Sequence, residues 1–303
     1  PAHEAIGRLM GTGEYRIPLL IVIALTSVAM AIKSGLYPFH TWIPDTYGYA
    51  TPAASAILSS LVSKGYVFLL IKIFYRVFDI SVTSDSHVLD VLFAFGIIAM
   101  IMGSVNAIQE NDLRRMIAYS SVAQIGYIYM GIGLGCEAGM VASLFHILSH
   151  STTKSLLFIA AGGLYEVSDN RKDYLSLRGA GYRNHLAGVA FTIAALSMVG
   201  VPMFSGFISK LLFATAAVQV RGKTFVALIA LAISTLLNTV YFLRTVVTLY
   251  AKEERQFTAE SKSYSNPLSY TGATLLLILM VIVLGVLSLP FVNLIQSGLS
   301  QIV

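Results

Sequence analysis

Three lysines, Lys64, Lys154 and Lys210, lie inside long apolar stretches of this 303-residue chain. A charge at the centre of a bilayer costs roughly 2.5–3.5 kcal/mol on insertion scales, so an intramembrane lysine indicates a functional site by default. An amine that is moved out of water releases its proton more easily, and it can then pass protons to its neighbours. The chemistry that these residues indicate is proton transfer within a membrane.

Two of these lysines follow the same local pattern. Lys64 lies in TPAASAILSSLVSKGYVFLLIKIFY (residues 51–75), and Lys210 lies in VPMFSGFISKLLFATAAV (residues 201–218). Each segment has a proline near its start, then small residues, and then a Ser-Lys pair before an apolar run. Small residues in membrane helices permit close packing. The pattern predicts that the chain contains the same lysine-bearing structural element twice.

A stripe of titratable side chains is predicted on a helix over residues 138–165. His146 and His150 are four residues apart, and Lys154 follows after four more. Residues at this spacing project from nearly one face of a helix, and Ser143 and Ser151 are expected to join them there. Because histidine has an unperturbed pKa of about 6.5, imidazoles in such a stripe are readily charged or neutral. The stripe predicts a proton relay.

Other polar residues of the apolar segments have interpretations that the sequence leaves open. Lys33 is either a member of the same polar system or a side chain that extends to the membrane interface. His146 is either a relay member or a packed, hydrogen-bonded histidine. Arg244 either extends to the interface or closes a contact between helices, and Asn106 and Asn238 are expected to hydrogen-bond between helices.

No cofactor, metal ion or catalytic group is predicted. The HILSH segment (146–150) has the spacing of a metal-binding pair, but no glutamate follows its first histidine and no third ligand is evident. The GIGLG segment (131–135) lies in an apolar stretch, outside the strand-to-helix context of a nucleotide-binding loop. The single cysteine, Cys136, excludes an internal disulfide and a cysteine-based zinc or iron–sulfur site.

The composition is that of an integral membrane protein. Hydrophobic residues make up 56% of the chain and charged residues 12%, and the mean hydropathy is +0.76. The formal charge of +5 lies in short connections, where Lys and Arg flank membrane spans, so it does not indicate a nucleic-acid partner. The predicted fold class is all-α, a polytopic transmembrane helical bundle.

We expect roughly nine segments of membrane length or nearly so within a single membrane domain, residues 1–303. Pro202 and Gly206 lie at a junction where an interrupted helix would expose backbone groups that only protein or water can satisfy. The Lys and Arg residues give no decisive asymmetry, so the membrane orientation stays open. The expected segments are 17–39, 51–75, 88–109, 115–135, 138–165, 186–202, 203–220, 224–250 and 269–299.

Five segments, in order, resemble one known family. In this order they are similar to the antiporter-like membrane subunits of respiratory complex I, of Mrp-type cation/proton antiporters and of membrane-bound hydrogenases. The resemblance covers about residues 17–250. The segments are KSGLYPFHTWIPDTY (33–47), the helix that carries Lys64, NDLRRMIAYSSVAQIGY (111–127), LSHSTTKSLLF (148–158) and MVGVPMFSGFISK (198–210).

The resemblance implies about fourteen spans with two inverted repeats, each containing a discontinuous helix that bears a lysine or an acid. Lys64 matches the first such lysine and Lys210 the second, and Lys154 with His150 matches a histidine-and-lysine helix. Together they would form a polar axis that conducts protons, with His146 and Lys33 as further candidates. Residues 17–110 would end the first repeat, residues 111–250 would form the second, and residues 269–299 would be a C-terminal transmembrane helix.

Two departures from the family pattern affect these expectations. Family members pair the first lysine with a glutamate on an earlier span, whereas Glu4 and Glu14 here lie in a polar leading segment that begins with Pro1. That segment is no signal peptide, so either the first five spans are missing from this chain or the ion pair is absent. Because the chain joins the family pattern midway, we expect a longer protein whose first spans are missing. Where many members read D-L-K-R, this chain has arginine at position 114; arginine is always protonated, so Arg114 with Asp112 is expected to be a fixed charge.

The sequence therefore predicts translocation of H⁺, or alternatively Na⁺, without bond-making chemistry of its own. The expected location is a prokaryotic plasma membrane, as a multi-pass protein in the lipid bilayer. The expected partners are other membrane subunits, in an NADH:quinone oxidoreductase-like, hydrogenase or Mrp-type antiporter complex. Two rival hypotheses stay open: a structural, non-conducting subunit of such a complex, and a solute transporter that acts without partner subunits.

Overall fold

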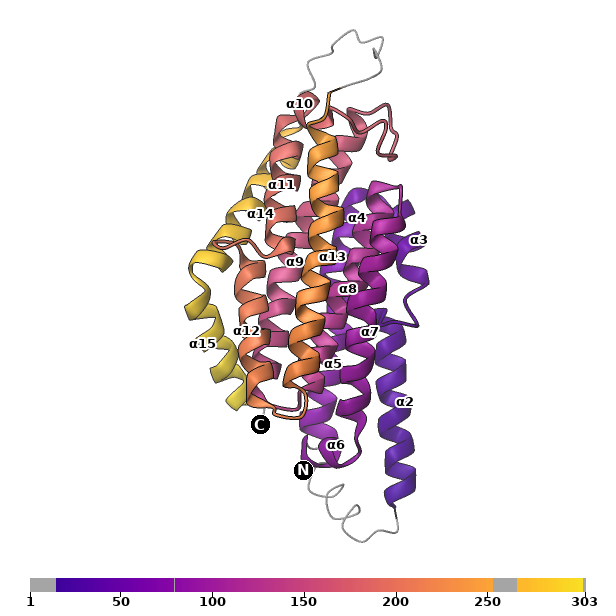
Figure 1. The fold of residues 1–303 in the computed structure, drawn as a ribbon, viewed down its shortest axis with the longest axis vertical. Helices are drawn as coiled ribbons and strands as arrows, with labels where there is room; N and C mark the ends of the chain where they lie inside the picture. Colours follow the sequence, from indigo (N-terminus) through magenta and orange to yellow (C-terminus); the bar gives the residue numbers. More distant parts are fainter. Residues whose placement is uncertain (1–14, 79, 253–265, 302–303) are drawn as a thin grey trace.

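The computed structural model describes residues 15–78, 80–252 and 266–301, and nearly all of this part of the chain is helical. Within these residues no β-strand forms, and an isolated bridge joins Asp112 to Asp173. Figure 1 shows most helices aligned with the long axis of the molecule. This alignment is expected of a bundle that crosses a bilayer.

The helices follow one another through short connections. Two π-helical segments belong to one continuous helix with α4 and α5: η1 (Leu58–Val62) joins α4 to α5, and η2 (Phe74–Phe78) follows α5. In chain order the α-helices are α2 (Arg16–Ser34), α3 (Trp42–Tyr49), α4 (Pro52–Ile57), α5 (Ser63–Ile73), α6 (Ile80–Asp85), α7 (Val88–Gln109), α8 (Leu113–Gly133), α9 (Glu137–Glu166), α10 (Ala180–Arg183), α11 (His185–Val199), α12 (Ser205–Gln219), α13 (Thr224–Leu249), α14 (Leu268–Val286) and α15 (Ser288–Ser300).

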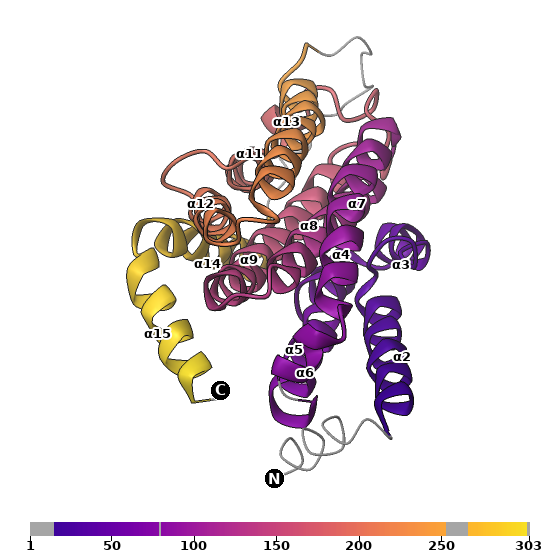
Figure 2. The same ribbon diagram turned by 60° about the horizontal axis from the view of Figure 1, so that its bottom comes forward.

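Five helical stretches among the described residues are long and apolar enough to cross a membrane: α2, Pro52–Phe78, α7, α13 and α14. Two further long helices, α8 and α9, are richer in polar residues, and most of their side chains are buried. Figure 2 shows α8 and α9 in the middle of the bundle, with α2 and α15 at its margins. The buried polar residues of α8 and α9 therefore lie inside the bundle.

Several predicted boundaries agree with the structure. The segments predicted at 88–109, 138–165 and 224–250 match α7, α9 and α13 to within one residue at each end. The segment predicted at 17–39 is too long, because α2 ends at Ser34. Gly35 follows in the left-handed conformation and donates to the carbonyls of Ala31 and Ile32, which closes the helix.

The prediction of one C-terminal helix over 269–299 is wrong. The chain forms α14 and α15, with a break at Leu287. Pro290 lies in the first turn of α15, where no backbone N–H is needed, whereas in a continuous helix its ring would clash with the preceding turn. The apolar composition is compatible with one helix or two, so hydropathy alone did not predict this break.

Helix α9 is the element around which the others pack. It contacts α4, α8, α11, α12 and α14, and the Sγ atom of Cys136 accepts the N–H of Gly139 at its first turn. Hydroxyls on this helix bond back to its own backbone: Thr152 donates to the Leu148 carbonyl at 3.0 Å and Thr153 to the Ser149 carbonyl at 2.8 Å. Such bonds let a polar helix lie in an apolar interior.

Helices α7 and α8 touch backbone to backbone. A Cβ atom added to Gly103 would lie 2.6 Å from the Ala123 amide nitrogen, and one added to Gly126 would lie 2.5 Å from the Gly96 carbonyl oxygen. Small residues at helix interfaces permit this approach in membranes, where packing replaces the hydrophobic effect between helices. The contact fixes the position of α8, which carries two hydrogen-bond partners of Lys154, the Ile117 carbonyl and the Ser120 hydroxyl.

The replacement Gly103→Ala is expected to lower the free energy of unfolding by about 1–3 kcal/mol, because overpacking of a close contact costs that much. The clash is with backbone atoms of Ala123, which have little freedom to shift. Thermal unfolding of the purified complex that contains the chain measures the effect. The matched control is Gly272→Ala, at a position with no atom within 4 Å; equal melting temperatures for the two variants would contradict the packing argument.

Helices α11 and α12 are two halves of an interrupted helix. Helix α11 ends at Val199, Gly200 adopts a φ of 93°, and α12 begins at Ser205. The prediction of an interruption next to Pro202 agrees with this break. The interruption exposes the last carbonyl groups of α11, which need hydrogen-bond donors.

Candidate functional site

Lys154 is fully buried in the middle of the bundle, with an exposed fraction of 0%. Its Nζ atom donates to the Ile117 carbonyl at 2.7 Å and to the Ser120 hydroxyl, both on α8. No ion pair between described residues includes Lys154. The amine is therefore held by neutral oxygen atoms, which stabilise an ammonium less than a carboxylate would.

Lys64 is the second residue of α5, which begins where the π-helical segment η1 ends. Its exposed fraction is 3%, and its Nζ atom donates to the Ser59 carbonyl and to the Ser63 hydroxyl at 3.3 Å. The first predicted discontinuity thus takes the form of a π segment within a helix that runs from Pro52 to Phe78. Segments of this kind occur often at functional sites.

The two histidines of α9 stack on each other. The ring centroids of His146 and His150 are 5.6 Å apart with an interplanar angle of 4°, and both residues are buried. His146 Nδ1 lies 2.6 Å from the Ser209 hydroxyl of α12. His146 Nε2 and both ring nitrogens of His150 have no protein partner among the described residues, so they can bind water or a transferred proton.

The side chain of Lys210, on α12, hydrogen-bonds across the break to the end of α11. Its Nζ atom donates to the carbonyls of Met198 at 3.1 Å and Val199 at 2.6 Å, at the end of α11. A cation at this position satisfies orphan carbonyls and interacts favourably with the negative end of the helix dipole. The ammonium also lies 6.0 Å from the centroid of the Tyr127 ring.

These residues form one row, which we call the central row: Lys64, Lys154, His150, His146 and Lys210. Between Lys64 and Lys154, the Ser59 hydroxyl lies 3.1 Å from that of Ser121, which donates to the Ile117 carbonyl at 3.2 Å. His150 lies one helical turn from Lys154 on α9. At the other end of the row, His146 bonds to Ser209, the residue before Lys210.

No carboxylate of the described residues pairs with the central row. Ion pairs in this part of the chain, such as those of His87 and Lys223 with Asp90 and of Arg115 with Asp45 and Glu110, include no member of the row. The segment that contains Glu4 and Glu14 lies outside the described residues. Within the described part of the chain, the central row is therefore purely basic.

Lys33 is not part of the central row. It lies in the last turn of α2, and its side chain is exposed on the outer face of the bundle. Its position matches the interpretation in which a lysine extends its ammonium towards an interface at the end of a span.

Arg114 and Asp112 lie at one end of the bundle, apart from the central row, where they hold the junction between α3 and α4. The Asp112 carboxylate accepts the N–H groups of Arg114 at 2.8 Å and Arg115 at 3.1 Å and so caps α8. The buried Arg114 guanidinium donates to the Ala50 carbonyl and to the Ser55 hydroxyl at 3.1 Å. Since guanidinium stays protonated, this is a permanent positive charge.

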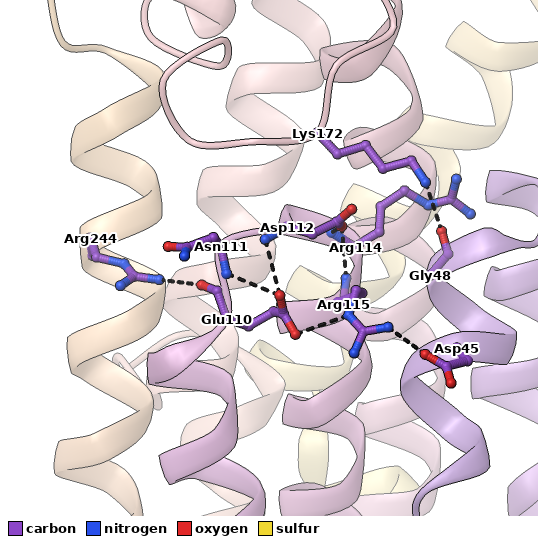
Figure 3. A network of polar contacts seen from close by, with 9 residues as sticks. All are labelled: Asp45, Gly48, Glu110, Asn111, Asp112, Arg114, Arg115, Lys172 and Arg244. Atoms are coloured by element: carbon purple, nitrogen blue, oxygen red, sulfur yellow. Dashed lines mark hydrogen bonds and ion pairs between the residues drawn. The ribbon is translucent and has the colours of Figure 1, made fainter.

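Other charged groups surround this junction (Figure 3). Arg115 pairs with Asp45 and Glu110, and Lys172 donates to the Gly48 carbonyl at 3.1 Å. Arg244 of α13 donates to the Glu110 carbonyl at 3.0 Å. For Arg244, the interpretation as a contact between helices therefore agrees with the structure.

Ser120, Ser209 and Tyr127 contact members of the central row, and Ser121 contacts Ser59 beside it. These serines and this tyrosine were not among the predicted site residues. Ser120 and Ser121 lie on α8, in the segment AYSSVA (118–123). Tyr127 stacks on His146 with centroids 5.5 Å apart. The sequence signal for these residues is a cluster of polar side chains in an otherwise apolar span.

The sequence model of one family, described as NADH:quinone oxidoreductase/Mrp antiporter, transmembrane, matches residues 4–237 of the chain. The chain belongs to this family. The match contains every residue of the central row, and it confirms the resemblance that the five ordered segments indicate.

The names of curated relatives support the assignment of the chain to this family. NADH-quinone oxidoreductase subunit N of Desulforudis audaxviator is 37% identical over 240 residues, which are 78% of this chain and 46% of the relative. F(420)H(2) dehydrogenase subunit N of Methanosarcina mazei is 30% identical over 285 residues, which are 91% of this chain and 56% of the relative. The chain spans about half the length of the curated relatives it matches.

Solved structures show the same fold. A chain in the structure of the Mrp complex from Dietzia sp. has a TM-score of 0.81 at 24% identity, with 93% of this chain and 59% of that chain covered. A chain of the archaeal membrane-bound sulfane sulfur reductase has a TM-score of 0.78 at 28% identity, with 90% and 54% covered. The predicted all-α, multi-pass, antiporter-like membrane fold is confirmed.

Proposed function

We infer that this chain translocates protons across the membrane along the central row, as one subunit of a complex of the complex I, hydrogenase or Mrp type. Its relatives are named as subunits of NADH-quinone oxidoreductase and F(420)H(2) dehydrogenase, and a structural neighbour belongs to an Mrp complex. Other membrane subunits are the proposed partners. Energy from those partners would drive the translocation.

The complete burial of Lys154 among neutral oxygen atoms carries this proposal. A lysine that served only to stabilise the bundle would be expected to pair with a carboxylate, because an unpaired charge in a low-dielectric interior is expensive. An amine that must gain and lose a proton needs the opposite environment, in which its charged and neutral forms are close in free energy.

The proposed step is electrostatic. Two unit charges about 4 Å apart interact by roughly 4 kcal/mol at an effective dielectric constant near 20, so a change of charge at one member of the row alters proton affinity at the next. A partner subunit that moves a countercharge towards or away from Lys64 would thereby release or draw in a proton. Lys154, the histidines and Lys210 would then change protonation state in sequence.

The basic character of the central row favours H⁺ over Na⁺. A sodium ion binds oxygen ligands, above all carboxylates, and is repelled by neighbouring ammonium groups. Within the described residues no three His, Cys, Asp or Glu side chains gather in one place. A proton, in contrast, adds directly to the amine and imidazole nitrogen atoms of the row.

Replacing Lys210 with methionine is expected to lower the rate of proton translocation by at least about tenfold, which corresponds to ~1.4 kcal/mol in the barrier. The variant removes both the titrating group and the donor to the Met198 and Val199 carbonyls. The measurement is proton uptake by vesicles that contain the purified complex, in sodium-free buffer, with a pH-sensitive dye.

The matched control is Lys72→Met, which removes an exposed lysine from α5 and leaves the central row intact. Assembly of the complex is followed on native gels for both variants. An assembled Lys210→Met complex that pumps as fast as the control would overturn proton translocation along the row. It would favour the rival hypothesis of a structural, non-conducting subunit.

A further inference from the structure

The imidazole of His146 is held by aromatic side chains from three helices' faces. The Tyr127 ring of α8 stacks on it with centroids 5.5 Å apart, and the Phe213 ring of α12 meets it edge-on at 5.4 Å. The His150 ring of its own helix stacks on it at 5.6 Å. These rings limit how the imidazole can turn, but within the described residues none of them hydrogen-bonds to its nitrogen atoms.

Among the described residues, the one hydrogen bond of this imidazole joins it to Ser209 of α12. Ser209 Oγ lies 2.6 Å from His146 Nδ1, and both residues are buried. His146 Nε2 has no protein partner in the described part of the chain. One nitrogen of the ring is therefore occupied by a hydroxyl, and the other is open to a proton.

The Ser209 hydroxyl makes this bond in place of the one that helical serines commonly make. Serine hydroxyls in helices can donate to the backbone carbonyl four residues earlier. Ser63, the matching serine of the first lysine segment, does so and donates to the Ser59 carbonyl at 3.2 Å. In the part of the chain that the structure describes, the hydroxyl of Ser209 bonds to His146 alone. This hydroxyl is directed at the imidazole and away from its own helix backbone.

A hydroxyl suits this position because it can donate or accept. A neutral imidazole has one N–H donor and one bare acceptor nitrogen, and a protonated imidazole has two donors. When His146 Nδ1 carries a proton, Ser209 Oγ accepts its N–H; when Nδ1 is bare, the hydroxyl turns and donates to it. Nδ1 therefore keeps a partner in every protonation state. A methyl group in place of the hydroxyl would leave this buried nitrogen unpaired, which is unfavourable.

Ser209 also ties His146 to the helix that bears Lys210. The first turns of α12 are held to their neighbours by polar contacts: Ser205 accepts from the Ser149 hydroxyl of α9 at 2.8 Å, and Lys210 donates to the last carbonyls of α11. Ser209 and Lys210 are adjacent residues of α12. The imidazole and the ammonium are therefore positioned by the same helix.

We propose that Ser209 is the positioning residue of His146: its hydroxyl holds the imidazole so that Nε2 exchanges protons while Nδ1 stays hydrogen-bonded. In the accepting step a proton adds to Nε2 of the neutral ring, and the imidazolium keeps the bond from Nδ1–H to Ser209 Oγ. In the releasing step Nε2 gives that proton up, and the neutral ring retains its proton on Nδ1. Ser209 neither gains nor loses a proton in this cycle.

This inference rests on the proposed function, and the two are tested by different variants. In vesicles of the purified complex, Ser209→Ala is expected to lower proton uptake by at least about threefold, because His146 loses its partner at Nδ1. Ser209→Thr keeps a hydroxyl at this position and is expected to pump faster than Ser209→Ala. A loss that a hydroxyl restores is not an effect of packing alone.

The matched control is Ser205→Ala, which removes an equally buried hydroxyl one turn earlier on α12 that is bonded to Ser149 and to no titrating group. Its proton uptake is expected to change little. Equal losses in Ser205→Ala and Ser209→Ala, or a Ser209→Thr complex that assembles and pumps no faster than Ser209→Ala, would overturn the positioning role. If Ser209→Thr does not assemble, the comparison of the other two variants decides.

The variant Lys154→Met separates this inference from the proposed function. Normal uptake in Ser209→Ala while Lys154→Met is inactive would overturn the positioning role alone. Normal uptake in Lys154→Met would overturn the proposed function together with the role of Ser209.

Discussion

Replacement of Lys154 with methionine is expected to reduce proton translocation to the background rate of vesicles without the complex, a loss of at least about tenfold. Lys154 is the fully buried amine at which the two halves of the central row meet. Methionine has similar length and packs well, but it neither binds a proton nor donates to Ile117 and Ser120. No titrating group would then remain between Lys64 and His150.

The companion variant Lys154→Arg separates the need for a charge from the need for titration. Arginine keeps a positive charge and the donors to α8, but its guanidinium is not deprotonated in proteins. We expect this variant to assemble and still fail to conduct, as measured by dye quenching in the same vesicles. An arginine variant that conducts normally would show that a fixed charge at this position is sufficient, and titration of Lys154 would be ruled out.

The periodic features of the chain predicted much of the fold. Hydropathy places α7, α9 and α13 within one residue of their observed ends, because long apolar spans are limited by bilayer thickness. Helical spacing also predicts that His146, His150 and Lys154 share a face of α9, since this is a local property of one helix. Nothing beyond the sequence of α9 is needed for that prediction.

Contacts between helices could not be predicted in the same way. Lys64 and Lys210 come from separate helices, and only the family resemblance indicates that they join the α9 stripe. The bridge through Ser59 and Ser121 depends on the register between η1 and α8. Lys33 has the same residue type and a similar apolar context, yet it faces outward, because the direction of a side chain depends on which neighbours the helix packs against.

Replacement of Lys64 with alanine is expected to lower proton translocation by at least about tenfold. The Lys64 ammonium donates to the Ser59 carbonyl in the π segment. Through the hydroxyls of Ser59 and Ser121, Lys64 is connected to Lys154. Loss of the amine removes the first titrating group of the row and the group on which a countercharge from a partner subunit would act. The measurement is proton uptake per turnover of the complex, so that slower turnover is not mistaken for lost coupling.

The double variant Lys64→Ala with Lys210→Met distinguishes one row from two independent paths. If protons pass through both lysines in series, the first replacement already blocks the path, and the double variant should translocate no more slowly than the slower single variant. Groups that act as a unit are strongly non-additive in this way. If each lysine served its own path, each single variant would keep the flux of the other path, and only the double variant would reach background. Retained flux in both single variants would therefore contradict a single central row, whereas background flux in each single variant would support it.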